Sequence, residues 1–173
     1  ASLMTGLLPH NHGVLQVIHT VDNDQSVLRK DRVHFAQILS REGYLTGYFG
    51  KWHIERSYQV QKFGWQVNGS DHTEKYRRLA KENGQKERAA LDPRLSKYIQ
   101  AAPGYRAFLH YGVSDISPEE RSDFIPVKLA LPFLTKALKQ KRPWCCCISF
   151  HGPNEAMIAT RKFYKKYPLR SIP

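Results

Sequence analysis

Apolar and polar positions in the first third of the chain alternate in a pattern that predicts a helix followed by a strand. Over residues 32–42, Val33, Phe35, Ile38 and Leu39 recur at helical spacing and define one apolar side. Asp31 is the expected cap of this helix and Gly43 its expected end. Residues 44–50 then read as a strand, because tyrosine, leucine, threonine and phenylalanine predominate there. Such a helix–strand unit is a building block of α/β sheets.

A second helix–strand pair is expected toward the end of the chain. Residues 122–140 read as a long amphipathic helix interrupted by Pro126 and Pro132, and residues 144–150 as a fully buried strand. Cys145, Cys146 and Cys147 would point alternately to opposite faces of that strand, which suits small core residues better than a disulfide. The inward side chains expected on the helix are Leu129, Phe133, Leu134, Ala137 and Leu138.

The remaining segments give weaker patterns. Residues 1–6 resemble the last turns of a helix that Gly6 ends in a left-handed conformation. Residues 55–72 read as a loop, and the charged stretch 73–83 is expected to break at Asn83-Gly84. Segments 92–101 and 105–111 are compatible with more than one type of structure, and Ser117 is expected to start a short helix.

Composition and charge restrict the class of protein. The chain has 173 residues with 41% hydrophobic content, enough for one globular domain, and we expect a single domain over residues 1–173. No apolar run reaches the roughly 20 residues that span a bilayer. Lys and Arg number 27 against 15 Asp and Glu, but the basic residues are spread along the chain and no nucleic-acid-binding motif accompanies them. Dedicated nucleic-acid binding is therefore not expected.

The segment from Gly43 to His53, with the sequence GYLTGYFGKWH, carries the strongest candidate chemistry. In extended geometry Lys51 and His53 point to the same side, about 6–7 Å apart, while Trp52 faces the other way. A fixed cation beside a titratable imidazole at the carboxyl end of a strand suits an oxyanion such as sulfate or phosphate. A Lys-Trp-His triplet at an exposed strand end is also compatible with ordinary surface.

Two motifs resemble signatures of the sulfatase family. The Gly-Tyr-x-Thr run leading into Gly50-Lys51-Trp52-His53 closely resembles the second signature, and residues 1–7, ASLMTGL, resemble the end of the first. In that family the first signature opens with a cysteine that becomes formylglycine, the nucleophile. The resemblance implies that this cysteine precedes Ala1, so that the chain is a piece of the N-terminal sulfatase domain, truncated at both ends and inactive by itself.

The resemblance also implies a fold and residue roles. The fold would be α/β, with a mixed, mostly parallel sheet flanked by helices, as in the alkaline-phosphatase-like superfamily. Lys51 would neutralise the nucleophile and a sulfate oxygen, and His53 would exchange a proton with the nucleophile. Residues 149–155 resemble a family element that contacts the sulfate ester, but the usual histidine is replaced by Asn154. His151 is the candidate that would replace it, and residues 163–167 together with the terminal Ile172-Pro173 resemble the segment that wraps back over the site.

Cofactors, substrates and alternatives follow from the same resemblance. A divalent metal, calcium in most family members, would have its ligands outside this chain, and Asp71, Asp115 and Asp123 read as turn or cap residues. The substrate would be a small-molecule or glycan sulfate ester. Secretion, a periplasmic location or a lysosomal one would fit the family, and the sequence selects none. The alternatives are a phosphonate or phosphate ester hydrolase of the same superfamily and an inactive segment that binds anionic glycans.

Overall fold

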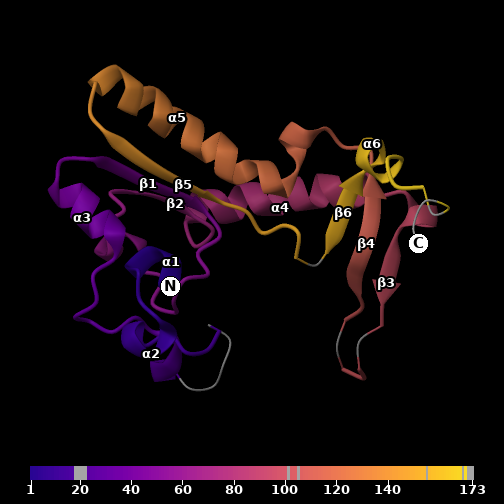
Figure 1. Ribbon diagram of the computed structural model, residues 1–173. Helices are drawn as coiled ribbons and strands as arrows, with labels where there is room; N and C mark the ends of the chain where they lie inside the picture. Colours follow the sequence, from indigo (N-terminus) through magenta and orange to yellow (C-terminus); the bar gives the residue numbers. More distant parts are fainter. Residues whose placement is uncertain (18–22, 101, 105, 155, 169, 171–173) are drawn as a thin grey trace. The chain divides into compact units, whose positions relative to one another are not determined.

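The computed structural model describes residues 1–17, 23–100, 102–104, 106–154, 156–168 and 170 (Figure 1). The chain divides into two compact units. The first comprises Ala1–Arg77 and Pro126–Phe150, and the second comprises Arg78–Ile125 and His151–Pro173. No described helix is long and apolar enough to cross a membrane.

A three-stranded parallel sheet forms the centre of the first unit. Its strands are β1 (Leu45–Gly50), β2 (Val67–Ser70) and β5 (Trp144–Ser149), in the order β2-β1-β5. Gly47 of β1 lies beside Val67 on one side and Cys146 on the other. Every residue of β1 is buried. The predicted strand at 44–50 is thus confirmed, to within one residue, as the central strand.

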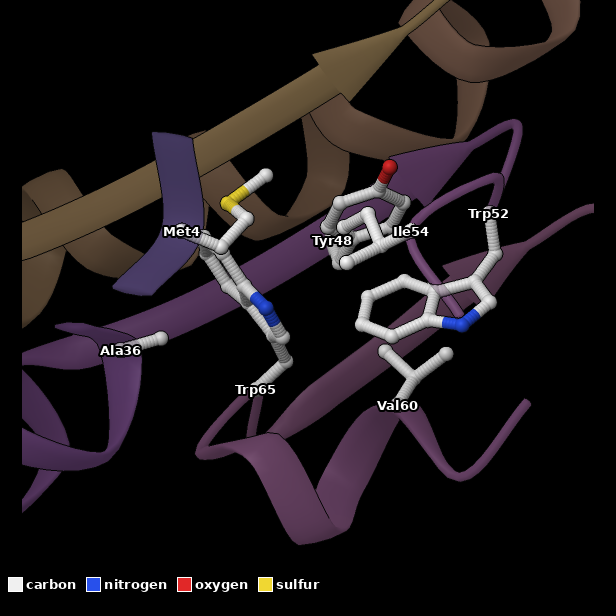
Figure 2. Packing of buried hydrophobic residues seen from close by; sticks show 7 residues of the cluster. All are labelled: Met4, Ala36, Tyr48, Trp52, Ile54, Val60 and Trp65. Atoms are coloured by element: carbon white, nitrogen blue, oxygen red, sulfur yellow. The ribbon is translucent and has the colours of Figure 1, made fainter. Parts of the chain in front are cut away.

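Side chains of β1 alternate between two apolar clusters, one on each face of the sheet. Leu45 and Phe49 pack with α5 (Ile125–Gln140), where the rings of Phe49 and Phe133 are 5.4 Å apart. On the opposite face, Tyr48 packs in a cluster with Trp52 and Trp65 (Figure 2). That cluster also includes Met4 of α1 (Ser2–Thr5) and Ala36 of α3 (Phe35–Arg41). Helices therefore cover both faces, which explains why β1 is apolar throughout.

The start of α3 differs from the prediction. His34, not Asp31, is the capping residue: its Nδ1 accepts a hydrogen bond from the Ala36 amide, and the side chain of Gln37 accepts one from the His34 amide. Histidine is an uncommon cap, so the sequence favoured the aspartate. The end of the helix is as expected, since Gly43 follows it with a positive φ of 83°.

Strand β2 lies within residues 55–72, which were predicted to be a loop, so that prediction is wrong. Its sequence, Val67-Asn68-Gly69-Ser70, is short and has little apolar alternation. Pairing with β1 stabilises it, and Gly69 is suited to the site because an added Cβ would lie 2.3 Å from Phe49. The same segment contains a 3₁₀ turn, η2 (Val60–Phe63).

Strand β5 and helix α5 are less buried than predicted. Trp144 is 43% exposed and the three cysteines are half-buried, because β5 lies at the edge of the sheet and β1 is its one partner among the described strands. Cys145 and Cys147 pack on one face and Cys146 on the other, as expected for successive strand residues. On α5, Phe133 and Ala137 are buried, but Leu138 is 67% exposed and is not an inward residue.

The remaining elements of the first unit are short. The chain forms α2 (Pro9–His12), ended by Gly13, and a 3₁₀ turn η1 (Asn23–Ser26). Gly6 ends α1 in the predicted left-handed conformation, with φ 69°.

The second unit contains a mixed sheet of β3 (Lys97–Ile99), β4 (Phe108–Ser114) and β6 (Met157–Thr160), in the order β3-β4-β6. β4 pairs antiparallel with β3 and parallel with β6. Its shorter elements are η3 (Pro93–Leu95), η4 (Pro118–Glu120), η5 (Ser122–Phe124) and α6 (Arg161–Tyr164). Ser117 precedes η4 as predicted, whereas the predicted tail Ile172-Pro173 lies outside the described residues.

Helix α4 (Glu74–Ala89) continues through Asn83-Gly84, where a break was predicted. A glycine inside a helix costs about 1 kcal/mol relative to alanine, which a long helix tolerates. The side-chain amide of Asn83 also donates to the Arg121 carbonyl at 3.1 Å, a contact that favours the helical position of Asn83.

Arg161 at the start of α6 joins two carboxylates of the second unit. Its guanidinium donates to Asp92 at 2.8 Å and to Asp115 at 2.9 Å. These hydrogen bonds lower the pKa of both carboxyl groups. Asp115, predicted to be a turn or cap residue, is therefore an ion-pair partner of Arg161.

Candidate functional site

Lys51 lies at the carboxyl edge of the parallel sheet, immediately after the central strand. Its amide donates to the carbonyl of Ser149, the last residue of β5, at 3.0 Å. On the other side, the amide of Asp71 donates to the Gly50 carbonyl at 2.9 Å. The carboxyl ends of all three strands thus meet around Lys51. In open α/β sheets this edge is where ligands bind.

Gly50 permits this close approach of the strand ends. It has a φ of 98°, and a Cβ placed on it would lie 1.9 Å from the Ser149 carbonyl oxygen. No other residue fits without displacing β5, because atoms that are not bonded to each other cannot come so close. The glycine in Gly-Lys-Trp-His is therefore a steric requirement of the sheet edge.

Tyr48 and Asp71 hold the backbone on either side of the Lys51 side chain. The hydroxyl of Tyr48 donates to the Lys51 carbonyl at 2.6 Å, and burial raises the pKa of this phenol, so it remains a donor. The Asp71 carboxylate accepts from the amide of Trp52 at 3.0 Å. Asp71 was predicted to be a turn or cap residue. It directly follows β2, a strand that the sequence did not predict.

Trp52 points into the core, as predicted, and anchors the segment there. It is 1% exposed, and its ring lies 4.9 Å from that of Tyr48 in an edge-to-face arrangement. Its indole N–H donates to the Glu55 carboxylate at 3.3 Å. Glu55 is fully buried and also accepts hydrogen bonds from Ser57 and from the Tyr58 amide, so it organises the turn that follows the motif.

His53 is exposed and lines a cavity of about 320 Å³ within the first unit. Ala1, Ser2 and His12 line the same cavity. The two segments that resemble family signatures, at residues 1–7 and 43–53, therefore share one cavity. Residues far apart in the sequence are brought together there by the fold.

His12 is a buried, neutral partner of Ser2 in this cavity. The Val14 amide donates to its Nδ1 at 3.0 Å, so the proton is on Nε2, which lies 3.0 Å from the Ser2 hydroxyl. Burial lowers the pKa of His12 and favours the neutral ring.

His151 and Asn154 belong to the second unit and line a different cavity, of about 420 Å³. The backbone amide of Asn154 donates to the backbone carbonyl of His151 at 3.3 Å. This hydrogen bond closes a turn that contains the cis Gly152–Pro153 peptide bond. Glu87, Arg121 and Asp123 line this cavity as well. The predicted site residues thus form two pairs. Lys51 and His53 lie on one short segment of the first unit, and His151 and Asn154 lie on one short segment of the second.

The described residues contain no group of three or more His, Cys, Asp or Glu side chains placed to hold a metal ion. Asp71 is engaged by the Trp52 amide, Asp115 by Arg161, and Asp123 by the Gly152 amide at 3.4 Å. The residues present do not form a metal centre by themselves.

Three solved structures have a fold similar to that of this chain. Ps i-CgsB matches with a TM-score of 0.57 at 20% identity, over 99% of this chain and 37% of that one. The same protein in complex with k-i-k-neocarrahexaose gives a TM-score of 0.55 at 20% identity, over 97% and 37%. A candidate sulfatase from Bacteroides fragilis, yidJ, gives 0.51 at 18% identity, over 95% and 35%. The predicted fold class, α/β with a mostly parallel sheet flanked by helices, is confirmed.

The sulfatase family model matches residues 1–172, and the chain belongs to that family. It spans little more than a third of the length of the solved structures that it matches. No curated protein matches the chain by sequence comparison.

Proposed function

We propose that this chain is the part of a sulfuric ester hydrolase that supplies the Lys51 and His53 side of the active site. The observation that carries the proposal is the cavity that His53, three residues after the end of β1, shares with Ala1 and Ser2. That edge gives an anionic group a fixed cation in Lys51 and a titratable imidazole in His53. Membership of the sulfatase family supports a hydrolase acting on sulfate esters.

Lys51 acts as an electrostatic clamp in this proposal. Its backbone is held by the Ser149 carbonyl and the Tyr48 hydroxyl, which fixes the point from which the ammonium group reaches toward a sulfate oxygen. Donors fixed in advance at the site of developing negative charge stabilise a transition state more than mobile ones do.

His53 acts as the proton-transfer group. An imidazole has an ordinary pKa near 6.5, so near neutral pH it both accepts and donates a proton. Its place in the cavity lined by Ala1 puts it beside the chain segment that, in the proposal, follows the nucleophile.

Two further groups belong to the proposed enzyme and lie outside this chain. A formylglycine preceding Ala1 would supply the attacking hydroxyl group, and a divalent metal, calcium in most relatives, would bind the sulfate oxygens through ligands elsewhere. Asn154 and His151 are proposed to contact the substrate from the second unit. A glycan sulfate is the favoured substrate class, because one similar structure was solved with a neocarrahexaose.

The decisive test is turnover of 4-nitrophenyl sulfate by the full-length protein and by its Lys51→Ala and His53→Ala variants. We expect each variant to lose about 10²-fold or more in kcat, the usual effect of removing one such group. Lys62→Ala, a change in η2 away from the cavity, is the matched control and should retain activity.

Parallel assays with 4-nitrophenyl phosphate and a phosphonate monoester test the closest alternative. Faster turnover of either would assign the protein to phosphate or phosphonate ester hydrolysis. If none of the three substrates is hydrolysed, the enzyme proposal fails and an inactive glycan-binding protein is the remaining interpretation.

A further inference from the structure

The cavity of the first unit contains a serine–histidine pair that the proposed mechanism does not use. Ser2, at the start of α1, and His12, at the end of α2, line this cavity together with His53. The Ser2 Oγ and the His12 Nε2 are 3.0 Å apart. All three residues belong to the first unit, and about 320 Å³ is within the range of small-molecule sites in proteins.

Hydrogen bonds fix both the ring and the backbone of His12. The residue is 1% exposed, and its Nδ1 accepts from the Val14 amide at 3.0 Å. The His12 amide donates to the Leu8 carbonyl at 3.0 Å, and the His12 carbonyl accepts from the Arg29 amide at 3.0 Å. The ring is therefore held in one orientation, in which its Nε2 meets Ser2.

The direction of the hydrogen bond between Ser2 and His12 follows from the partner of Nδ1. A ring nitrogen that accepts from an amide carries no proton, so the neutral ring has its proton on Nε2 and donates it to the Ser2 oxygen. The proton of the Ser2 hydroxyl is not used in this contact. Among the described residues the hydroxyl makes no second hydrogen bond, so Ser2 offers a donor to a ligand in the cavity.

The same direction separates two functions of a serine–histidine pair. A histidine that activates a serine for nucleophilic attack must accept the hydroxyl proton, whereas the His12 Nε2 donates to the serine oxygen. The pair is therefore not arranged as a nucleophile with its base. A hydroxyl whose oxygen is already held by an N–H group has few remaining orientations, which suits the recognition of an acceptor at a fixed position.

We propose that Ser2 binds an oxygen of a tetrahedral oxyanion in this cavity, and that His12 is a positioning residue that orients the Ser2 hydroxyl. Sulfate and phosphate groups both have the required chemistry, because their charged oxygens accept stronger hydrogen bonds than neutral oxygens do. The inference rests on the proposed function, because the anion is taken to be the sulfate group of the substrate. It adds Ser2 to the groups that would hold that anion beside His53.

The test of Ser2 is binding of inorganic sulfate and inorganic phosphate to the full-length protein, measured by isothermal titration calorimetry. We expect Ser2→Ala to weaken binding of the preferred anion by about 10-fold or more, the usual effect of one hydrogen bond to a charged group. Ser2→Thr keeps the hydroxyl and should restore most of the affinity. Ser40→Ala, a change in α3 away from the cavity, is the matched control and should leave the affinity unchanged.

Two variants of His12 distinguish positioning of Ser2 from a purely structural role. A glutamine side chain places a donor nitrogen near the position of Nε2, whereas an asparagine side chain retains an acceptor for the Val14 amide but does not reach Ser2. We expect His12→Gln to keep most of the anion affinity and His12→Asn to lose as much as Ser2→Ala does. Combining Ser2→Ala with His12→Asn should cost no more than either change alone, because both remove the same interaction.

Thermal unfolding of each variant establishes that it is folded. Ser2 is exposed, so its variants decide the question even if a His12 variant does not fold. Retention of anion binding in His12→Asn together with its loss in His12→Gln would show that His12 only supports its own turn, and the positioning role would be wrong.

The remaining failures are distinguishable from one another. Equal anion affinity in Ser2→Ala and the unmodified protein would overturn the Ser2 site, and so would an unmodified protein that binds neither anion. If the unmodified protein binds sulfate through Ser2 but hydrolyses no sulfate ester, the proposed function fails and the anion site stands.

Discussion

The amide of Trp52 donates a hydrogen bond to the Asp71 carboxylate at 3.0 Å, which ties the residue after the catalytic lysine candidate to the end of the neighbouring strand. Asp71 is itself fixed by its own amide, which donates to the Gly50 carbonyl. The segment that carries Lys51 and His53 is thus held by β2 as well as by its own strand. We propose that Asp71 is a positioning residue, because its carboxylate holds the backbone amide next to Lys51.

Replacing Asp71 by alanine should lower catalytic turnover while leaving the protein folded. The Trp52 amide would lose its acceptor and the Lys51–His53 segment would become less well placed, and small misplacements of a catalytic group cost up to about 10²-fold in rate. The measurement is kcat and KM for 4-nitrophenyl sulfate, and we expect the change mainly in kcat.

Asparagine at position 71 is the informative comparison, because its Oδ1 still accepts the Trp52 amide hydrogen bond. Asp71→Asn should therefore recover most of the activity that Asp71→Ala loses. Equal losses in the two variants would show that the negative charge, and not the hydrogen bond, is the essential property.

Gly50→Ala should destabilise the protein severely. The added methyl group would lie 1.9 Å from the Ser149 carbonyl oxygen, so β1 and β5 must separate at their carboxyl ends. Gly43→Ala has a similar positive φ of 83° but meets nothing within 4 Å, and it should cost only about 1–2 kcal/mol of backbone strain. Denaturant unfolding of the two variants measures the free energy of unfolding of each, and the difference is the cost of the steric clash with Ser149. If the two variants lost similar amounts of stability, the clash would be contradicted.

Stability should fall as the pH is lowered from about 6.5 to about 4, through the titration of His34. Burial lowers the pKa of this fully buried imidazole to about 4, whereas in the unfolded chain it is near 6.5. Below 6.5 the unfolded chain takes up a proton that the folded one does not, so the free energy of unfolding decreases. The difference corresponds to about 3 kcal/mol once the pH has fallen below 4.

His34→Asn tests this assignment, because asparagine is a good helix cap and does not titrate. The variant should retain α3 and lose much of the pH dependence of unfolding in that range. An unchanged slope in urea unfolding measured between pH 7 and pH 4 would assign the effect to other groups.

The three adjacent cysteines should react slowly with thiol reagents in the folded protein. Burial raises the pKa of Cys146 and Cys147 to about 11, so that at pH 8 only about 0.1% of each is thiolate, the reactive form. Labelling with 5,5′-dithiobis(2-nitrobenzoic acid) should be slow in buffer and fast in denaturant. Rapid labelling of all three thiols in buffer would contradict the packing of β5.

The sequence was sufficient to predict the central strand, because residues 44–50 are strand formers buried on both faces. The sequence was also sufficient to predict the family, since the short motifs at residues 1–7 and 43–53 are specific to sulfatases. Strand β2 was not predictable in the same way, because Asn68, Gly69 and Ser70 have weak strand preference and are held in place by pairing with β1.

The residues that support the Lys51–His53 segment were also not predicted, because their roles depend on tertiary structure. Asp71 and Glu55 look like ordinary loop residues in the sequence, and their roles depend on where β2 and the turn after Trp52 lie in space. The exposure of Trp144 and Leu138 was likewise not predictable, because an apolar run has the same appearance whether its strand is central or at an edge.

The Gly50-Lys51-Trp52-His53 motif serves two independent demands. Gly50 is fixed by the approach of Ser149 and Trp52 by the aromatic core, and neither reason involves catalysis. Lys51 and His53 have no comparable steric constraint. If a descendant lost the proposed enzymatic role, natural selection for folding would preserve the glycine and the tryptophan, while the lysine and the histidine would be free to change. The glycine and the tryptophan would then indicate whether the protein still folds, and the lysine and the histidine whether it could still be catalytically active.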